Sequence, residues 1–136
     1  MAGVQVKPKV FRYAVDLGED GHLRNEEGEP LADTPGWTPE HFLLAGVIRC
    51  SLKSLRYHAK RAGIEVTHAT GTARGVIEKR ETDGRFGLVE TVIELDVHLE
   101  PRPGEDELAA LLAKAERDCF VGASLVVPPI YRWTMS

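Results

Sequence analysis

Two cysteines, Cys50 and Cys119, carry the chemistry that this sequence could perform. Cys50 lies inside an apolar run that begins after Thr38, and Cys119 ends a run in which acidic, basic and apolar residues alternate. A thiolate attacks electrophilic oxygen or sulfur, and a second thiol close to it traps the oxidised product as a disulfide. This chemistry requires tertiary structure to ionise one thiol and to bring the other within reach.

The composition indicates one globular domain that covers residues 1–136. With 43% hydrophobic residues, the chain is large enough to bury a core without disulfides. Its net charge of -4 gives no general attraction to nucleic acid or to anionic membranes, because both bind concentrated positive charge. We therefore expect neither nucleic acid nor a membrane as a partner.

The ends and the apolar runs of the sequence predict a cytoplasmic protein. Residues 1–10 contain no apolar run long enough for a signal peptide, and no stretch approaches the roughly 18 apolar residues of a membrane span. In a reducing compartment thiols stay free, so the two cysteines are expected to be catalytic, redox-active or simply buried. A permanent disulfide is not expected.

Thr38-Pro39-Glu40 predicts the start of a helix. Threonine caps free amides, proline suits the first helical position, and glutamate in the first turn interacts favourably with the helix dipole. The pattern predicts a helix from residue 39 to about residue 62, ending at Gly63. One stripe holds Leu44, Ile48, Leu52, Leu55, Ala59 and Ala62, the opposite side holds Arg49, Lys53, Arg56 and Lys60, and Cys50 lies between them.

The remaining elements predict an α+β fold. We expect an N-terminal hairpin (7–15 and 22–24), a short strand near 30–32, a long antiparallel hairpin (64–79 and 87–99, with a turn at 82–85), a second helix (105–118), one or two helical turns after Cys119 and an extended tail (130–134). This order favours an antiparallel sheet over a parallel βαβ fold.

Other functional sites are less favoured by the pattern. The five histidines are scattered, and neither Cys-x-x-Cys nor His-Glu-x-x-His occurs, so no metal site is expected. The basic stripe is typical of a solvated helix face rather than a phosphate site. Phe42, Leu43, Tyr57 and Phe120 are expected in the core, where part of this group could line a slot for a hydrophobic ligand.

Two local motifs and the order of elements resemble the OsmC/Ohr family of thiol-dependent peroxidases. Thr38-Pro39-Glu40, followed by Leu43-Leu44-Ala45 and Cys50, is similar to the family's Asn-Pro-Glu-Glu-Leu segment, which leads to a helical cysteine. The run that begins at Cys119 and ends at Leu125 is similar to its Cys-Pro-Val-Ser-x-Ser-Leu segment, with Phe120 and Gly122 where Pro and Ser are common. Arg49 also replaces a residue that is usually small.

The resemblance implies an OsmC-like fold, in which antiparallel sheets pack with two long helices in an intertwined homodimer with its sites at the subunit interface. It implies that Cys50 is the peroxidatic thiol, Cys119 the resolving thiol, and Glu40 the carboxylate that orients an arginine beside the sulfur. The family's arginine lies in an N-terminal Gly-Gly-Arg loop, which this sequence lacks. Arg12 lies nearest the expected place, and Arg24 is the other candidate.

The implied reaction reduces organic hydroperoxides, and hydrogen peroxide less well, as a defence against oxidative stress. Cys50 is oxidised to a sulfenic acid and then forms a disulfide with Cys119, which an external dithiol, with a lipoyl-type dithiol as one candidate, must reduce. No metal, flavin or haem is required. A free cysteine with a pKa of about 8.5 is mostly protonated at neutral pH, so a nearby guanidinium is expected to favour the thiolate.

Helix geometry adds an expectation about the subunits. Glu40 and Cys50 are ten residues apart, which is about 15 Å along a helix axis. We therefore expect Glu40 and the arginine to reach Cys50 of the partner subunit.

Two other functions remain open from the sequence. The chain could be a non-catalytic OsmC-like module that senses redox state or binds a small molecule, as the missing Gly-Gly-Arg loop allows. It could also be a structural interaction protein in which both cysteines are incidental buried side chains.

Overall fold

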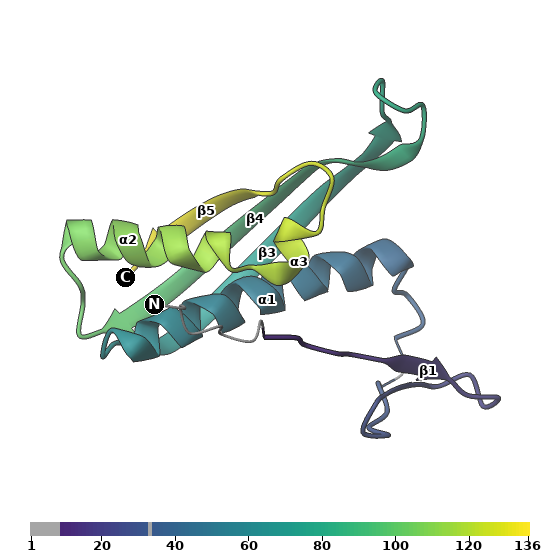
Figure 1. The fold of residues 1–136 in the computed structure, drawn as a ribbon, viewed down its shortest axis with the longest axis horizontal. Coiled ribbons are helices and arrows are strands. Elements are labelled where there is room, and N and C mark those ends of the chain that lie inside the picture. Colours follow the sequence, from purple (N-terminus) through teal and green to yellow (C-terminus); the bar gives the residue numbers. More distant parts are fainter. Residues whose placement is uncertain (1–8, 33) are drawn as a thin grey trace, which may run out of the picture. The chain divides into compact units, whose positions relative to one another are not determined.

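The computed structural model describes residues 9–32 and 34–136. The chain divides into two compact units, Met1–Gly36 and Trp37–Ser136, and each contains its own sheet (Figure 1). The single domain expected from the length of the chain stays a prediction.

The first unit contains a short antiparallel hairpin of β1 (Val15–Leu17) and β2 (Leu23–Asn25). Gly21, with φ of 82°, makes the tight connection possible, because a side chain disfavours this conformation. The first strand is shorter than expected. Residues 7 and 8 of that prediction lie outside the described residues, and residues 9–14 form no ladder because β2 is too short to pair with them. The strand expected near 30–32 is one bridge between Arg24 and Pro30.

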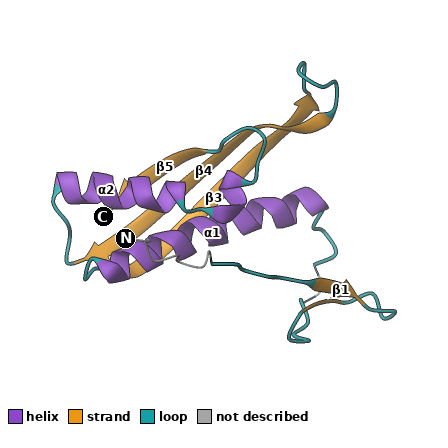
Figure 2. Cartoon of the chain, viewed as in Figure 1, coloured by secondary structure: helices purple, strands orange, loops and turns teal. Residues whose placement is uncertain are grey.

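The second unit begins with helix α1 (Pro39–Arg61), which confirms the predicted helix (Figure 2). Its start is capped in both directions: the His41 amide donates to Thr38 Oγ1 at 3.4 Å, and the Thr38 amide donates to His41 Nδ1 at 2.9 Å. The chain leaves the helix through Gly63, whose φ is 74°. Leu55 and Ala59 of the predicted apolar stripe are fully buried, and its basic counterparts are exposed.

A three-stranded sheet follows, with the strand order β3-β4-β5. The long hairpin of β3 (Glu65–Lys79) and β4 (Phe86–Glu100) is antiparallel, as predicted. The tail forms β5 (Ile130–Met135), which pairs parallel to β4, so the sheet is mixed. Helices α2 (Glu105–Arg117) and α3 (Phe120–Ala123) provide the crossover that brings the chain back to the end where β4 starts. The α+β fold class is confirmed.

Helices α1 and α2 cover the same face of this sheet, where Val97 and Leu99 of β4 pack against Leu55 of α1 and Leu111 of α2 (Figure 1). Strand β3 presents small residues to α1. A Cβ at Gly71 would lie 2.7 Å from the Leu95 side chain and 3.5 Å from Ile48, and one at Gly75 would lie 3.3 Å from Leu44. These glycines therefore let α1, the helix that carries Cys50, lie close to the sheet.

Candidate functional site

The structure brings Cys50 and Cys119 into one buried cluster, although they are far apart in the sequence. Helix α1 positions Cys50, and the junction of α2 and α3 positions Cys119, which is the N-cap residue of α3. Both pack with Val47, Ile93 and Leu95, and both are free thiols. Cys119 is fully buried and Cys50 is half-buried, so only Cys50 presents its side chain partly to solvent.

The surroundings of Cys50 favour its protonated thiol over the thiolate. Burial raises the pKa of Cys50, the backbone amides of Val121 and Phe120 act in the opposite direction, and Cys119 adds to the rise. The Val121 amide donates to Cys50 Sγ at 3.4 Å. Because the net effect is a raised pKa, Cys50 needs a further positive group before it becomes a strong nucleophile at neutral pH.

Two hydroxyl groups surround Cys119, and sequence reasoning identified neither of them. Ser51 Oγ lies 3.4 Å from Cys119 Sγ and donates to the Val47 carbonyl at 2.7 Å. Burial, and next a hydrogen bond with Cys119, raise the pKa of the Tyr131 phenol. The position of Ser51 next to Cys50 was a weak signal, whereas the position of Tyr131 depends on the parallel pairing of β5 with β4.

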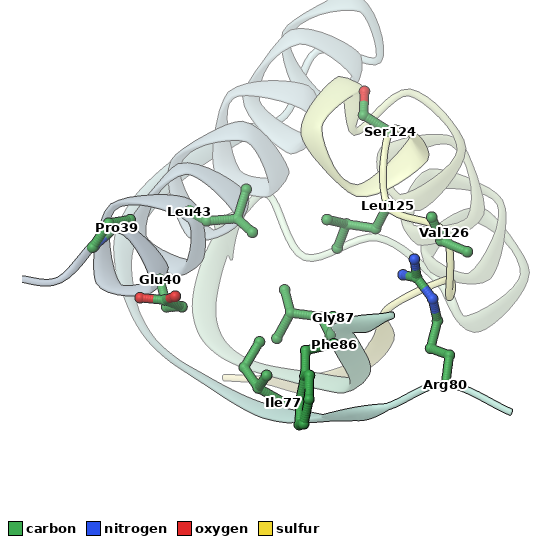
Figure 3. Close-up of a pocket in the computed structure, with 11 residues that line it drawn as sticks. Pro39, Glu40, Leu43, Ile77, Arg80, Phe86, Gly87, Ser124, Leu125 and Val126 are labelled. Atoms are coloured by element: carbon green, nitrogen blue, oxygen red, sulfur yellow. The ribbon is translucent and has the colours of Figure 1, made fainter. Parts of the chain in front are cut away.

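Glu40 lines an open groove of about 470 Å³ at the start of α1 (Figure 3). The groove is mainly apolar, and the side chains that line it include Leu43, Ile77, Phe86, Leu125 and Val126. Arg80 lies across the groove from Glu40, with its guanidinium near Val126. Asp83 holds that guanidinium through two hydrogen bonds of 3.2 and 2.8 Å. Arg80 is thus an arginine of the groove that sequence reasoning missed.

Glu40 and Cys50 do not meet within one chain. Both belong to the continuous helix α1, and their ten-residue separation corresponds to about 15 Å along its axis. Cys50 is not among the residues that line the groove of Glu40.

The two candidate arginines, Arg12 and Arg24, belong to the unit that does not contain Cys50. Arg24 is held by Asp20 through two hydrogen bonds of 3.3 and 2.7 Å. Arg12 is exposed and precedes β1, and no described residue forms an ion pair with it. Of the two, Arg12 has the guanidinium that is free to bind another group.

The aromatic residues expected in the core differ in their exposure. Tyr57 and Phe120 are each 53% exposed, so their predicted burial was wrong. Tyr57 lies on the outer side of α1, where the Arg61 guanidinium is 5.6 Å from its ring centroid. Phe42 is half-buried beside Trp37, with the ring centroids 5.5 Å apart.

Within the described ranges, no group of three or more His, Cys, Asp or Glu residues is arranged to hold a metal ion. None of the helices in the same part of the chain combines the length and apolarity needed to cross a membrane.

Comparison with known proteins gives a family match over most of the chain. The sequence model of a family described as OsmC-like protein matches residues 31–131. No match was found among curated proteins.

Solved structures show the same fold at low sequence identity. An OsmC-like protein of unknown function from Vibrio cholerae is 14% identical with a TM-score of 0.73, and covers 93% of this chain and 99% of its own. An organic hydroperoxide resistance protein from Elizabethkingia anophelis is 23% identical with a TM-score of 0.61 (97% and 99% covered). The organic hydroperoxide resistance protein OhrB of Bacillus subtilis is 19% identical with a TM-score of 0.57 (92% and 96% covered).

Proposed function

The chain belongs to the OsmC family, and we propose that it is a cysteine-based peroxidase that reduces organic hydroperoxides to alcohols, and hydrogen peroxide less well. The observation that carries this proposal is the pairing of a half-buried Cys50 with a fully buried Cys119 in one cluster. A partly accessible thiol next to a protected one is the arrangement that a two-cysteine oxidation cycle needs. We place this activity in the cytoplasm, as part of the defence against oxidative stress.

The first half-reaction takes place at Cys50. Its thiolate attacks one peroxide oxygen, the O–O bond breaks, the departing alkoxide takes a proton to become the alcohol, and Cys50 keeps the other oxygen as a sulfenic acid. The amides of Val121 and Phe120 favour the thiolate, but burial outweighs them in the described residues. An arginine, Arg12 or Arg24, supplies the missing positive charge in our proposal, and Glu40 orients it.

In the second half-reaction, Cys119 attacks the Cys50 sulfenic acid. The S–S bond forms, the S–O bond breaks, and hydroxide leaves with the Cys119 proton as water. An external dithiol then reduces the disulfide, and a lipoyl-type dithiol is our candidate. None of these steps needs a metal or an organic cofactor.

We propose that the working form is an intertwined homodimer. Several apolar side chains of the first unit are largely exposed in the single chain, among them Val10 (62%), Tyr13 (68%), Val15 (68%) and Leu17 (70%). Exposed apolar rows of this kind favour association. In a dimer, Glu40 and the arginine would act on Cys50 of the partner subunit, and the separation of about 15 Å between Glu40 and Cys50 along α1 supports this part of the proposal.

The apolar groove beside Glu40 is our proposed place for the hydrophobic part of the substrate. Leu43, Leu125 and Val126, which line the groove in Figure 3, would contact an alkyl or aryl group. A hydroperoxide with a sizeable apolar group would then bind better than hydrogen peroxide, because it removes more apolar surface from water.

Thiol loss tests the proposal directly. Reduced protein is mixed with cumene hydroperoxide, and free thiols are counted over time. We expect rapid loss of both thiols, none in Cys50→Ser, and a sulfenic acid that dimedone traps in Cys119→Ser. Slow loss at both cysteines with no effect of Cys50→Ser would contradict a peroxidase.

One observation favours a second candidate function, a redox-sensing or small-molecule-binding module without turnover. Burial raises the pKa of Cys50, and such a thiol reacts slowly unless a cation is recruited. Turnover of hydroperoxide with dihydrolipoamide separates the two candidates. A catalyst consumes many equivalents of peroxide per chain, whereas a sensor stops after one oxidation.

A further inference from the structure

Cys119 is embedded in an apolar cluster that contains a small pair of hydroxyl groups, Ser51 on α1 and Tyr131 on β5. Ser51 Oγ lies 3.4 Å from Cys119 Sγ. The Tyr131 hydroxyl is close to the same sulfur, because a Cβ at Gly122 would contact both of them. The remaining neighbours in the cluster are apolar, and they include Val47, Ile93 and Leu95. Deprotonation of a thiol in an apolar cluster has a high desolvation cost. The few polar groups that contact Cys119 Sγ therefore decide how readily it becomes a thiolate.

The two hydroxyl groups have different roles, because only one of them has a proton that it can donate to Cys119. Ser51 has one proton, and it uses that proton to donate to the Val47 carbonyl at 2.7 Å. Its oxygen therefore faces Cys119 as an acceptor for the thiol proton. Tyr131 keeps its own proton, since burial raises the pKa of its phenol further above the usual value of about 10. The phenol is therefore the hydrogen-bond donor available to the sulfur.

Gly122 provides the space for the Tyr131 hydroxyl. A Cβ at Gly122 would collide with that hydroxyl and would lie 3.1 Å from Cys119 Sγ. The similar family motif commonly has Ser at this position, whereas this chain has Gly. The Tyr131 hydroxyl thus lies close to the position that the Cβ of a serine at residue 122 would occupy, near Cys119 Sγ.

We propose that Tyr131 is a catalytic residue of the second half-reaction, in which its phenolic O–H donates a hydrogen bond to Cys119 Sγ while that sulfur becomes a nucleophile. This role rests on the proposed function. As the S–S bond forms and the S–O bond of the Cys50 sulfenic acid breaks, the displaced hydroxide takes the Cys119 proton and leaves as water. Tyr131 keeps its proton throughout, and Ser51 holds the thiol in position by accepting from it.

A disulfide reagent isolates this step from peroxide chemistry. Reduced protein is mixed with 5,5′-dithiobis(2-nitrobenzoate). Attack by Cys50 releases a first coloured thiolate, and attack by Cys119 on the resulting mixed disulfide releases a second one and a proton. In Tyr131→Phe we expect an unchanged first release and a second release that is slower by roughly tenfold to a hundredfold, as the loss of a hydrogen bond to a charged group predicts.

The controls separate the hydroxyl from the fold. Tyr131→Phe keeps the ring that stacks on Trp133, with centroids 6.5 Å apart. Tyr57→Phe removes an exposed phenol whose hydroxyl accepts from Arg61, and it should change neither release. Adding Gly122→Ser to Tyr131→Phe returns a hydroxyl to the vacated space and should restore part of the second rate.

Two results would overturn the role of Tyr131. One is an unchanged second release in Tyr131→Phe, and the other is an equal slowing of both releases, which indicates a structural effect. Inertness of the wild-type protein toward cumene hydroperoxide would instead refute only the peroxidase proposal, because the reagent measures Cys119 without peroxide.

Discussion

Subunit complementation tests whether Glu40 acts on the Cys50 of a partner. Within one chain the two residues lie about 15 Å apart, where a unit charge contributes only about 0.3 kcal/mol in water, or about 0.2 pKa units. Glu40→Gln should therefore have little direct effect on Cys50 of the same chain. If Glu40 contacts the arginine beside Cys50 of another copy, Glu40→Gln should inactivate the site of that copy. Cys50→Ser inactivates its own site but keeps Glu40 intact.

The two inactive variants are refolded together in equal amounts, and hydroperoxide reduction is assayed. Random pairing in a two-fold symmetric dimer makes about half of the dimers mixed, and each of these has one site with both Cys50 and a partner's Glu40. The mixture should regain about one quarter of the wild-type activity, since one site in four is intact. A mixture as inactive as the separate variants would refute the assignment across subunits, and Glu40→Gln alone serves as the matched control.

Three further predictions follow from the geometry and the charges. Gly122→Ala should destabilise the fold by about 1–3 kcal/mol in denaturant unfolding, because the new methyl group collides with the Tyr131 hydroxyl, and Tyr131→Phe should recover part of this loss. Arg117 holds the pKa of Asp118 below its usual value, so stability from this carboxylate is present above about pH 4 and is lost as the pH falls; Asp118→Asn should flatten that decline in acid unfolding curves. If Arg12 or Arg24 offsets the raised pKa of Cys50, its replacement by Gln should move the pH midpoint of Cys50 alkylation above the ordinary thiol value of about 8.5. An unchanged pH profile in both variants would exclude both arginines.

The local structure of this chain follows from its sequence because its signals are local. Thr38 and Pro39 start α1, and Gly63 ends it, through caps and turn conformations that depend on a few neighbouring residues. The β3–β4 hairpin likewise depends on strand propensity and one turn, which includes Gly84 with φ of 70°.

The features that could not be predicted depend on pairing across the fold. The direction of β5 depends on where α2 and α3 return the chain, and no residue of the tail encodes it. For this reason Tyr131 was expected only in an extended segment and not beside Cys119. The raised pKa of Cys50 was also hidden, because the sequence does not show how deeply a helix flank is covered.

The unequal exposure of the two sulfurs sets the direction in which a disulfide between them could be opened. Cys119 has no accessible surface, whereas Cys50 has some. An incoming reductant would therefore bond first to the Cys50 sulfur and expel Cys119 as the leaving thiolate. Hydroperoxide and reductant would thus both approach the exposed side of Cys50, one after the other. Substrate that is still bound there would slow reduction of the disulfide.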